Sequence, residues 1–111
     1  LGPGTGDSGF GRGGGGVTRA EKIAGTITDD DYPRAARQRR SEGEVTVNYD
    51  ITTGGRVVNC RVVGPSGDVD LDATTCRLIR ERFRYRPATR AGQPVADVAG
   101  WRQSWWLEGR R

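Results

Sequence analysis

The chain has no histidine, and only two of its 111 residues are cysteines. Neither cysteine belongs to a Cys-x-x-Cys pair, so a four-ligand zinc site would have to recruit carboxylates. The Gly-x-Ser-x-Gly motif of serine hydrolases and the glycine-rich phosphate loop are also missing, and a catalytic cysteine would lack an activating base. An enzyme is therefore the weakest interpretation of this sequence.

Hydrophobic residues are scarce as well. They make up 33% of the chain, and no apolar run approaches the roughly eighteen residues that a membrane-spanning helix needs. No signal-peptide pattern opens the chain. The first sixteen residues include nine glycines, which leaves a folding unit of about 90 residues. A core of that size has no room for a buried active site, so we expect the function to lie on the surface.

Basic residues outnumber acidic ones, 18 against 14, which gives a net charge of +4. Arginine accounts for all but one of these basic residues, and the exception is Lys22. A net positive charge suits an acidic partner but does not specify one.

The N-terminal part of the chain is predicted to be extended. Residues 1–16 form a glycine-rich linker end, which is expected to be disordered because chains of this composition behave as flexible coils. Residues 17–31 follow as an extended lead-in segment, in which Ile23, Gly25 and Ile27 form a short alternation.

A short helix is predicted next, from Pro33 to about Arg40. Proline suits the first turn of a helix, where its missing N–H costs nothing. The acidic run at residues 29–31 lies beside the positive end of the helix dipole, which favours the same start. Three adjacent carboxylates without the spacing of a cation-binding loop are poor evidence for a metal site, so we expect none.

The clearest strand signal follows this helix. Polar and apolar side chains alternate over residues 44–51, and the apolar face consists of Val45, Val47, Tyr49 and Ile51. A turn at the glycine pair 54–55 leads into a second strand over residues 56–63, so the two strands form a hairpin. One face of the second strand carries Val58, Cys60 and Val62.

A longer helix is predicted after the hairpin, with Asp70 as its N-cap. Its sheet-facing stripe, recognised by helical spacing, consists of Cys76, Ile79 and Phe83. Pro87 ends the helical pattern, and a turn at residues 91–94 leads into a last extended segment that runs to residue 107. Residues 108–111 form a short C-terminal tail.

The order helix, strand, strand, helix, strand predicts an α+β fold. A right-handed crossover carries the chain over the sheet through the long helix and places the third strand beside the first. The result is a three-stranded antiparallel sheet with two helices packed on one face.

Cys60 and Cys76 face one another in this arrangement, because one lies in the middle of a strand and the other on the helix stripe above it. A disulfide can join them if their Cα atoms lie within about 4.4 to 6.8 Å. Two small buried thiols are the alternative, since unpaired cysteine is often a core residue. The sequence favours the disulfide and leaves the thiols open.

The third strand is an edge of the predicted sheet, and an unpaired edge is a template for another strand. Trp101, Trp105 and Leu107 share one face of this strand and are expected in the core, whereas Trp106 points to the other side. The candidate partner-binding residues of this strand are Val98, Ala99, Gly100, Trp101, Arg102, Gln103, Ser104, Trp105 and Trp106.

A set of short motifs follows in a fixed order over residues 32–107. The motifs are Tyr-Pro (32–33), Gly-x-Val-x-Val (43–47), Gly-Arg-Val (55–57), Ser-Gly (66–67), Leu-Asp (71–72), aromatic-x-aromatic-x-Pro (83–87) and Gly-x-Pro (92–94) before an aromatic strand. No single motif is specific, but the ordered set resembles the C-terminal domain of TonB-type energy transducers.

This resemblance implies a periplasmic domain without cofactors, tethered to the inner membrane through an N-terminal anchor that is missing here. Such domains work with the proton-driven motor proteins ExbB and ExbD. Their last strand captures the TonB box, a short segment of outer-membrane transporters, and transmits force for the uptake of large nutrients such as iron chelates. Nucleic acid is not an expected partner.

The resemblance also assigns a second partner-binding segment, made up of Asp29, Asp30, Asp31, Tyr32 and Pro33. The chain departs from the family here, because three aspartates stand where the family often carries uncharged polar residues. The glycine-rich linker end is a second departure.

Two other binding functions stay open. A periplasmic linker domain of the TolA type shares this fold. Basic residues interleaved with Phe83, Tyr85 and the tryptophans also fit a binder of single-stranded nucleic acid, although Phe83 falls on the buried stripe. Salt separates strand addition from nucleic-acid binding, because only nucleic-acid affinity falls steeply with salt.

Overall fold

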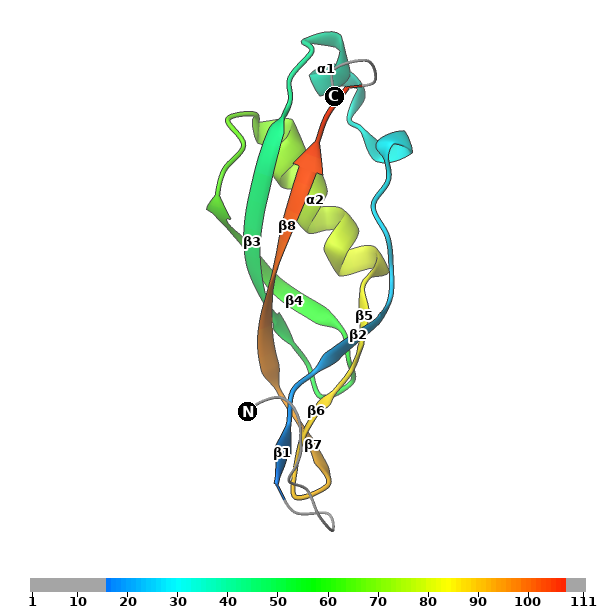
Figure 1. Ribbon diagram of the computed structural model, residues 1–111, viewed down its shortest axis with the longest axis vertical. Helices are drawn as coiled ribbons and strands as arrows, with labels where there is room; N and C mark the ends of the chain where they lie inside the picture. Colours follow the sequence, from blue (N-terminus) through cyan, green and yellow to red (C-terminus); the bar gives the residue numbers. More distant parts are fainter. Residues whose placement is uncertain (1–15, 108–111) are drawn as a thin grey trace.

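The computed structural model describes residues 16–107, so the predicted linker end before residue 16 and the tail at residues 108–111 lie outside the described residues. The fold is α+β, with antiparallel sheets and two α-helices, as predicted (Figure 1). The N-terminal elements are β1 (Val17–Thr18), β2 (Glu21–Ala24), the 3-10 helix η1 (Asp29–Asp31) and α1 (Arg34–Gln38). The main sheet and its helix consist of β3 (Gly43–Ile51), β4 (Val57–Gly64), α2 (Val69–Arg82) and β8 (Asp97–Trp105). Between α2 and β8 lie β5 (Arg84–Arg86), β6 (Ala88–Arg90) and β7 (Gln93–Val95).

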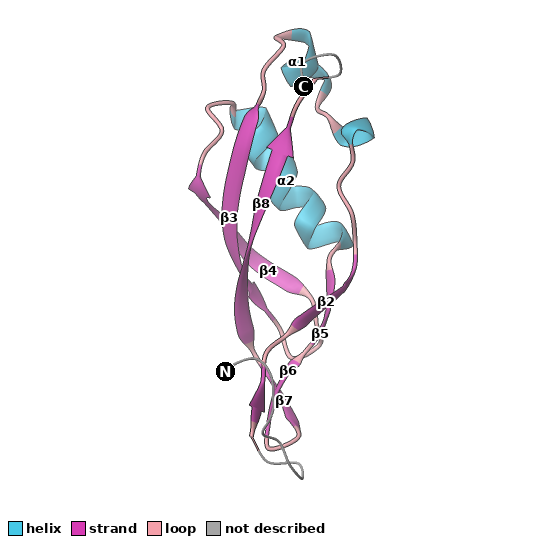
Figure 2. Ribbon diagram, viewed as in Figure 1, coloured by secondary structure: helices cyan, strands magenta, loops and turns pink. Residues whose placement is uncertain are grey.

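The central strand of the main sheet is β3, and the strand order is β4-β3-β8 (Figure 2). Both neighbours run antiparallel to β3. The last long strand therefore returns beside the first, as the predicted crossover requires. Helix α2 crosses one face of this sheet, and the short α1 lies near the end of the sheet where β8 ends (Figure 1).

The alternation predicted for β3 is confirmed. Val45, Val47 and Tyr49 are completely buried and Ile51 is 1% exposed, while the residues between them lie on the opposite face. Burying a valine or isoleucine side chain stabilises a fold by roughly 1.5 to 3 kcal/mol. This strand is therefore the centre of the core.

The second strand, β4, differs from the predicted pattern. Its pairing with β3 shifts between Asn48 and Asp50, where Asn59 adopts a left-handed conformation with φ of 56°. Such a bulge inserts an extra residue and changes which side chains point inward. Val57 is buried at 4% exposure and Val58 is 37% exposed, so the prediction that Val58 shares the inward face with Cys60 is wrong.

Helix α2 begins two residues earlier than its predicted cap implied. The N-cap is Asp68 and not Asp70: the Asp68 carboxylate accepts the backbone N–H groups of Asp70 and Leu71 at 2.8 and 3.2 Å. The helix ends before Phe83, which is extended and fully buried. By accepting these two hydrogen bonds, the Asp68 carboxylate satisfies N–H groups that the first helical turn leaves without partners.

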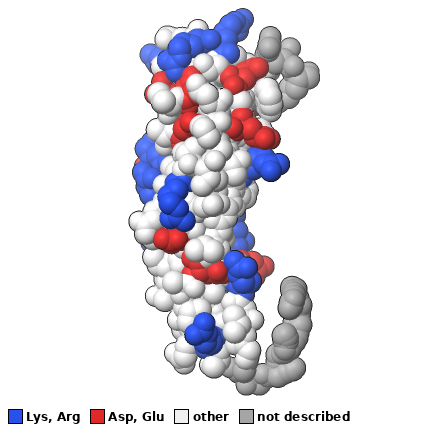
Figure 3. Space-filling model, turned by 90° about the vertical axis from the view of Figure 1, so that its left-hand side faces the viewer, with Lys and Arg blue, Asp and Glu red and all other residues white. Residues whose placement is uncertain are grey.

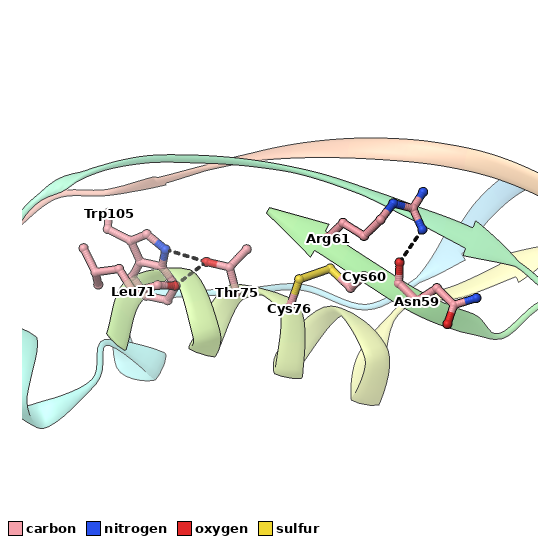
Figure 4. The surroundings of a disulfide bond; sticks show 7 residues. All are labelled: Asn59, Cys60, Arg61, Leu71, Thr75, Cys76 and Trp105. Carbon is pink, nitrogen blue, oxygen red and sulfur yellow. Dashed lines mark hydrogen bonds between the residues drawn. A yellow bond between two sulfur atoms is a disulfide. The ribbon is translucent and has the colours of Figure 1, made fainter. Parts of the chain in front are cut away.

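A disulfide joins β4 to α2, between Cys60 and Cys76 (Figure 4). The two Cα atoms are 5.6 Å apart. The prediction of a disulfide from strand and helix parity is thus confirmed in the structure. The covalent bond holds the helix against the edge strand of the sheet on the side away from β8.

Two small sheets were not predicted. In one, β2 pairs with β5, and in the other β1 and β7 flank β6. The segment read as a single turn and last strand instead forms a β6–β7 hairpin, with Ala91 and Gly92 at positive φ, followed by β8. These sheets hold residues 17–24 against residues 84–95, which follow α2.

Removing the disulfide should destabilise the domain without changing its fold. A loop of about sixteen residues is closed by the bond, which corresponds to about 3 kcal/mol of unfolding free energy in the chain-entropy model. We expect the double variant Cys60→Ser/Cys76→Ser, and the reduced wild type, to lose a similar amount in urea denaturation. Equal stability of the oxidised and reduced wild type would contradict the structural role of the bond.

Candidate functional site: the free edge of strand β8

Strand β8 has one paired side and one unpaired side. Its nine residues pair with β3 without a register shift, from Gly43 opposite Trp105 to Ile51 opposite Asp97. Within residues 16–107 no strand pairs with its other side. A regular unpaired edge exposes a row of backbone N–H and C=O groups that another strand can bind.

Side-chain contacts show which backbone groups of β8 point to the free edge. Arg19 Nη2 donates to the carbonyl of Val98 at 3.1 Å, and Asp97 Oδ1 accepts the N–H of Val98 at 2.8 Å. Gln103 Nε2 donates to the carbonyl of Ser104 at 3.2 Å. Because the backbone groups of successive residues point to opposite sides of a strand, Val98 and Ser104 both face the free edge.

The same alternation assigns the residues between these two. Gly100 and Arg102 also face the free edge, and the odd-numbered residues of β8 bond to β3. The β3–β4 hairpin supports this assignment. Just after β3, the N–H of the even-numbered Thr52 points toward β4, where it donates to the carbonyl of Arg56 at 2.9 Å. Even-numbered residues of β3 thus bond to β4, and odd-numbered residues bond to the odd-numbered residues of β8 in the observed register.

The N-terminal end of the free edge of β8 is already covered by the segment around Arg19. Asp97 Oδ2 accepts hydrogen bonds from Arg19 Nε and from the N–H of Ala20, both at 2.9 Å. Burial alone would raise the pKa of Asp97, but the hydrogen bonds from Arg19, Ala20 and Val98 outweigh it and lower the pKa. The N-terminal segment therefore covers the edge at Val98, and the open part runs from Gly100 to Ser104.

The tryptophans of this region lie on the predicted faces. Trp105 is 1% exposed and donates from Nε1 to the hydroxyl of Thr75 at 3.0 Å (Figure 4). Trp101 is partly buried against the core. Trp106 is 43% exposed. The buried threonine was not singled out from the sequence, because a hydroxyl on the buried stripe of a helix gives no separate signal.

The other edge of the sheet is less regular. Strand β4 has two register shifts against β3, and its Asn59 carbonyl already accepts a hydrogen bond from Arg61 Nη1 at 2.7 Å (Figure 4). Bulges and charged side chains at an edge disfavour the addition of another strand. Of the two edges, β8 is therefore the one that suits an added strand.

The second candidate segment, residues 29–33, is partly used by the fold. Asp31 forms two hydrogen bonds of 2.7 Å with the guanidinium of Arg82 at the end of α2. Tyr32 is 6% exposed, and its ring meets that of Trp105 edge to face at 5.3 Å. Asp30 is exposed, and Pro33 is the N-cap of α1. Binding of a partner by this segment stays a prediction.

Within residues 16–107, no group of three or more acidic or cysteine side chains is arranged to hold a metal ion. None of the helices in that range is long and apolar enough to cross a membrane.

Two comparisons with known proteins agree on one family. A family model for the C-terminal region of the Gram-negative bacterial TonB protein matches residues 29–99. The solution NMR structure of the TonB C-terminal domain from Pseudomonas aeruginosa is similar, with a TM-score of 0.66 at 25% sequence identity. That similarity covers 85% of this chain and 92% of the Pseudomonas chain. A search of curated proteins finds no match.

The ion pair between Asp31 and Arg82 should make stability depend on pH. The hydrogen bonds from Arg82 lower the pKa of Asp31 to about 2, below the usual value of about 3.9. The stabilisation is therefore complete above about pH 4 and is lost as the pH falls through about 2. We expect Asp31→Asn to lower Tm by a few degrees at pH 7 and by less at pH 2.5.

Asp30→Asn is the matched control, because it removes a neighbouring, exposed aspartate. Its Tm should stay close to that of the wild type across this pH range. A Tm difference between Asp31→Asn and wild type that is the same at pH 7 and pH 2.5 would contradict the role of the carboxylate charge.

Proposed function

Because the chain belongs to the family of C-terminal domains of the Gram-negative bacterial TonB protein, we propose that it binds the TonB box of an outer-membrane transporter through the free edge of β8. The family is periplasmic and non-catalytic and interacts with outer-membrane transporters. We propose further that an N-terminal anchor tethers the full protein to the inner membrane, where ExbB and ExbD supply the energy that it transmits for nutrient uptake.

The observation that carries this proposal is the regular, open edge of β8. Gly100, Arg102 and Ser104 direct three N–H and three C=O groups to this edge, by the alternation described above, and of these the C=O of Ser104 accepts a hydrogen bond from the Gln103 side chain. The family match ends at residue 99, so this part of the argument rests on the geometry of the strand.

Strand addition at this edge gives weak but mechanically coherent binding. Each backbone hydrogen bond contributes about 1 kcal/mol net, and association costs at least about 4 kcal/mol of lost motion. Equilibrium affinity is therefore modest. A pull along the strand loads the hydrogen bonds together in shear, so a transient contact can still carry force.

The aromatic residues do not favour binding of single-stranded nucleic acid. Phe83 is fully buried and Trp105 is 1% exposed, so neither offers a stacking surface to a base. Acidic and basic side chains are interspersed over the face shown in Figure 3. The match to the TonB family also favours the TonB box over the partner of a TolA-type domain.

Replacing Ser104 by proline tests the edge directly. Proline removes the edge-facing N–H and places its ring where the added strand would lie, yet it takes no hydrogen bond from the β3–β8 ladder. We expect Ser104→Pro to fold, and to weaken the binding of a fluorescent TonB-box peptide from the same organism at least tenfold by anisotropy.

Ser104→Ala is the matched control, since it loses the same side-chain contact to Glu44 and keeps the N–H. It should bind like the wild type, as should Arg80→Ala on the outer side of α2. By contrast, Gln103→Pro removes a donor to β3 and should lower the stability of the domain itself. If folded Ser104→Pro binds as well as Ser104→Ala, the proposal is wrong.

A further inference from the structure

Lys22 is the only lysine of the chain, and its ammonium group lies over two aromatic rings beside β8. Its Nζ atom is 4.5 Å from the ring centroid of Phe83 and 5.2 Å from that of Trp101. The two rings meet edge to face with their centroids 4.8 Å apart. The negative faces of aromatic rings attract a cation, which favours this position of the ammonium group.

The chain around Lys22 fixes this position. Nζ donates to the carbonyl of Gly25 at 2.6 Å, and Lys22 lies opposite Tyr85 in the β2–β5 pair. Gly25 has a φ of 109°, and a Cβ atom there would lie 2.6 Å from the carbonyl oxygen of Arg82. Only glycine fits at this contact, so the acceptor of Lys22 is held against the end of α2.

The ammonium group has no carboxylate partner in the part of the chain that the structure describes. Within residues 16–107 no carboxylate oxygen lies within 4.0 Å of Nζ. Three acidic residues of adjoining segments pair with arginines instead: Glu21 with Arg86, Asp31 with Arg82, and Asp97 with Arg19.

Only one of the three N–H donors of Lys22 has an oxygen acceptor within residues 16–107, and the ammonium group otherwise contacts ring faces, which a carboxylate can compete with. That acceptor is the carbonyl of Gly25. Lys22 is also partly buried. A partly buried cation without a counter-charge is a favourable place for an anion, because pairing offsets the cost of removing charge from water.

The segment that carries Lys22 contacts the free edge of β8 at its N-terminal end. Three residues earlier, Arg19 donates to the edge-facing carbonyl of Val98, and β2 runs from there to its partner β5 (Figure 1). Trp101, beside the ammonium group, lies on the helix-facing side of β8 between two edge-facing residues. An added strand would therefore pass next to the ammonium group.

We propose that Lys22 binds a carboxylate side chain of the peptide captured by β8, and so selects an acidic residue on the helix-facing side of that peptide. A strand added to β8 lies about 4.8 Å away and directs every second side chain to that face. Lysine suits this task, because its ammonium is a compact charge with rotatable donors. The inference rests on the proposed strand addition.

A glutamate scan of the peptide tests the selection. The probes are blocked TonB-box peptides of about ten residues in which one glutamate, or a matched glutamine, is moved along an otherwise neutral sequence. For the wild type we expect the glutamate peptide to bind roughly three- to tenfold more tightly than the matched glutamine peptide. This preference should appear only at every second position, the parity whose side chains face the helix side. Lys22→Gln should remove this preference and leave the affinity for the glutamine peptides unchanged, and Lys22→Arg should restore part of it.

Because Lys22 is the only lysine, cross-linking gives an independent measurement. Carbodiimide activates the peptide carboxylate, Nζ of Lys22 attacks the carbonyl carbon, and the urea leaves, so the product is an amide whose mass equals the two chains less one water. We expect mass spectrometry to place this amide at Lys22 for the glutamate positions of the favoured parity. Arg80→Gln, a control at an exposed cation, should change neither affinity nor cross-linking.

The outcomes separate this inference from the proposed function. Binding of all peptides with equal affinity, with shifts of the β8 edge amides in NMR spectra but no cross-link at Lys22, would overturn the role of Lys22 and leave strand addition intact. A parity-independent glutamate effect, or one that persists in folded Lys22→Gln, would also overturn it. No amide shift with any peptide would overturn both proposals.

Discussion

The pairing of β3 on both sides is the constraint from which the rest of the structure follows. Its odd-numbered residues bond to β8 and its even-numbered residues to β4, while Val45, Val47, Tyr49 and Ile51 fill the core on one face. Since no further strand follows β8 in residues 16–107, one long row of its backbone groups has no partner strand. The binding edge is therefore a consequence of the topology, and its chemistry lies in the backbone.

The two edges of the sheet differ in the regularity of their strands. On β4, the left-handed Asn59 breaks the ladder and the disulfide at Cys60 ties the strand to α2. On β8, the register is unbroken, and side chains bind its edge at Val98, from Arg19, and at the carbonyl of Ser104, from Gln103. Arg19 lies close to the N-terminal tether proposed above, so tether and binding strand are joined by a short path of hydrogen bonds through Asp97.

The sequence predicts the long elements well because their signals are local and repeated. Four apolar side chains at a spacing of two define β3, and the parity of Cys60 and Cys76 favours a disulfide over two buried thiols. The errors have physical causes. One residue at positive φ reverses the parity of part of β4, which a period-two pattern cannot register, and strands as short as β2 and β5 form only through pairing between segments about 60 residues apart.

The candidate site is harder to read from a sequence than the fold. Backbone groups at an edge carry no residue signature, so the position of β8 in the sheet, and not its composition, identifies them. Lys22 escapes a motif search because it reaches Trp101 from a segment far away in the chain.

One signal does exist: a single lysine stands in a chain whose other basic residues are all arginine. Glu21, Asp31 and Asp97 each pair with an arginine, whose planar fork suits a carboxylate in a fixed place. The lysine ammonium instead lies over two aromatic rings. Beside the edge, Lys22 is thus a partly buried cation without a carboxylate partner within residues 16–107.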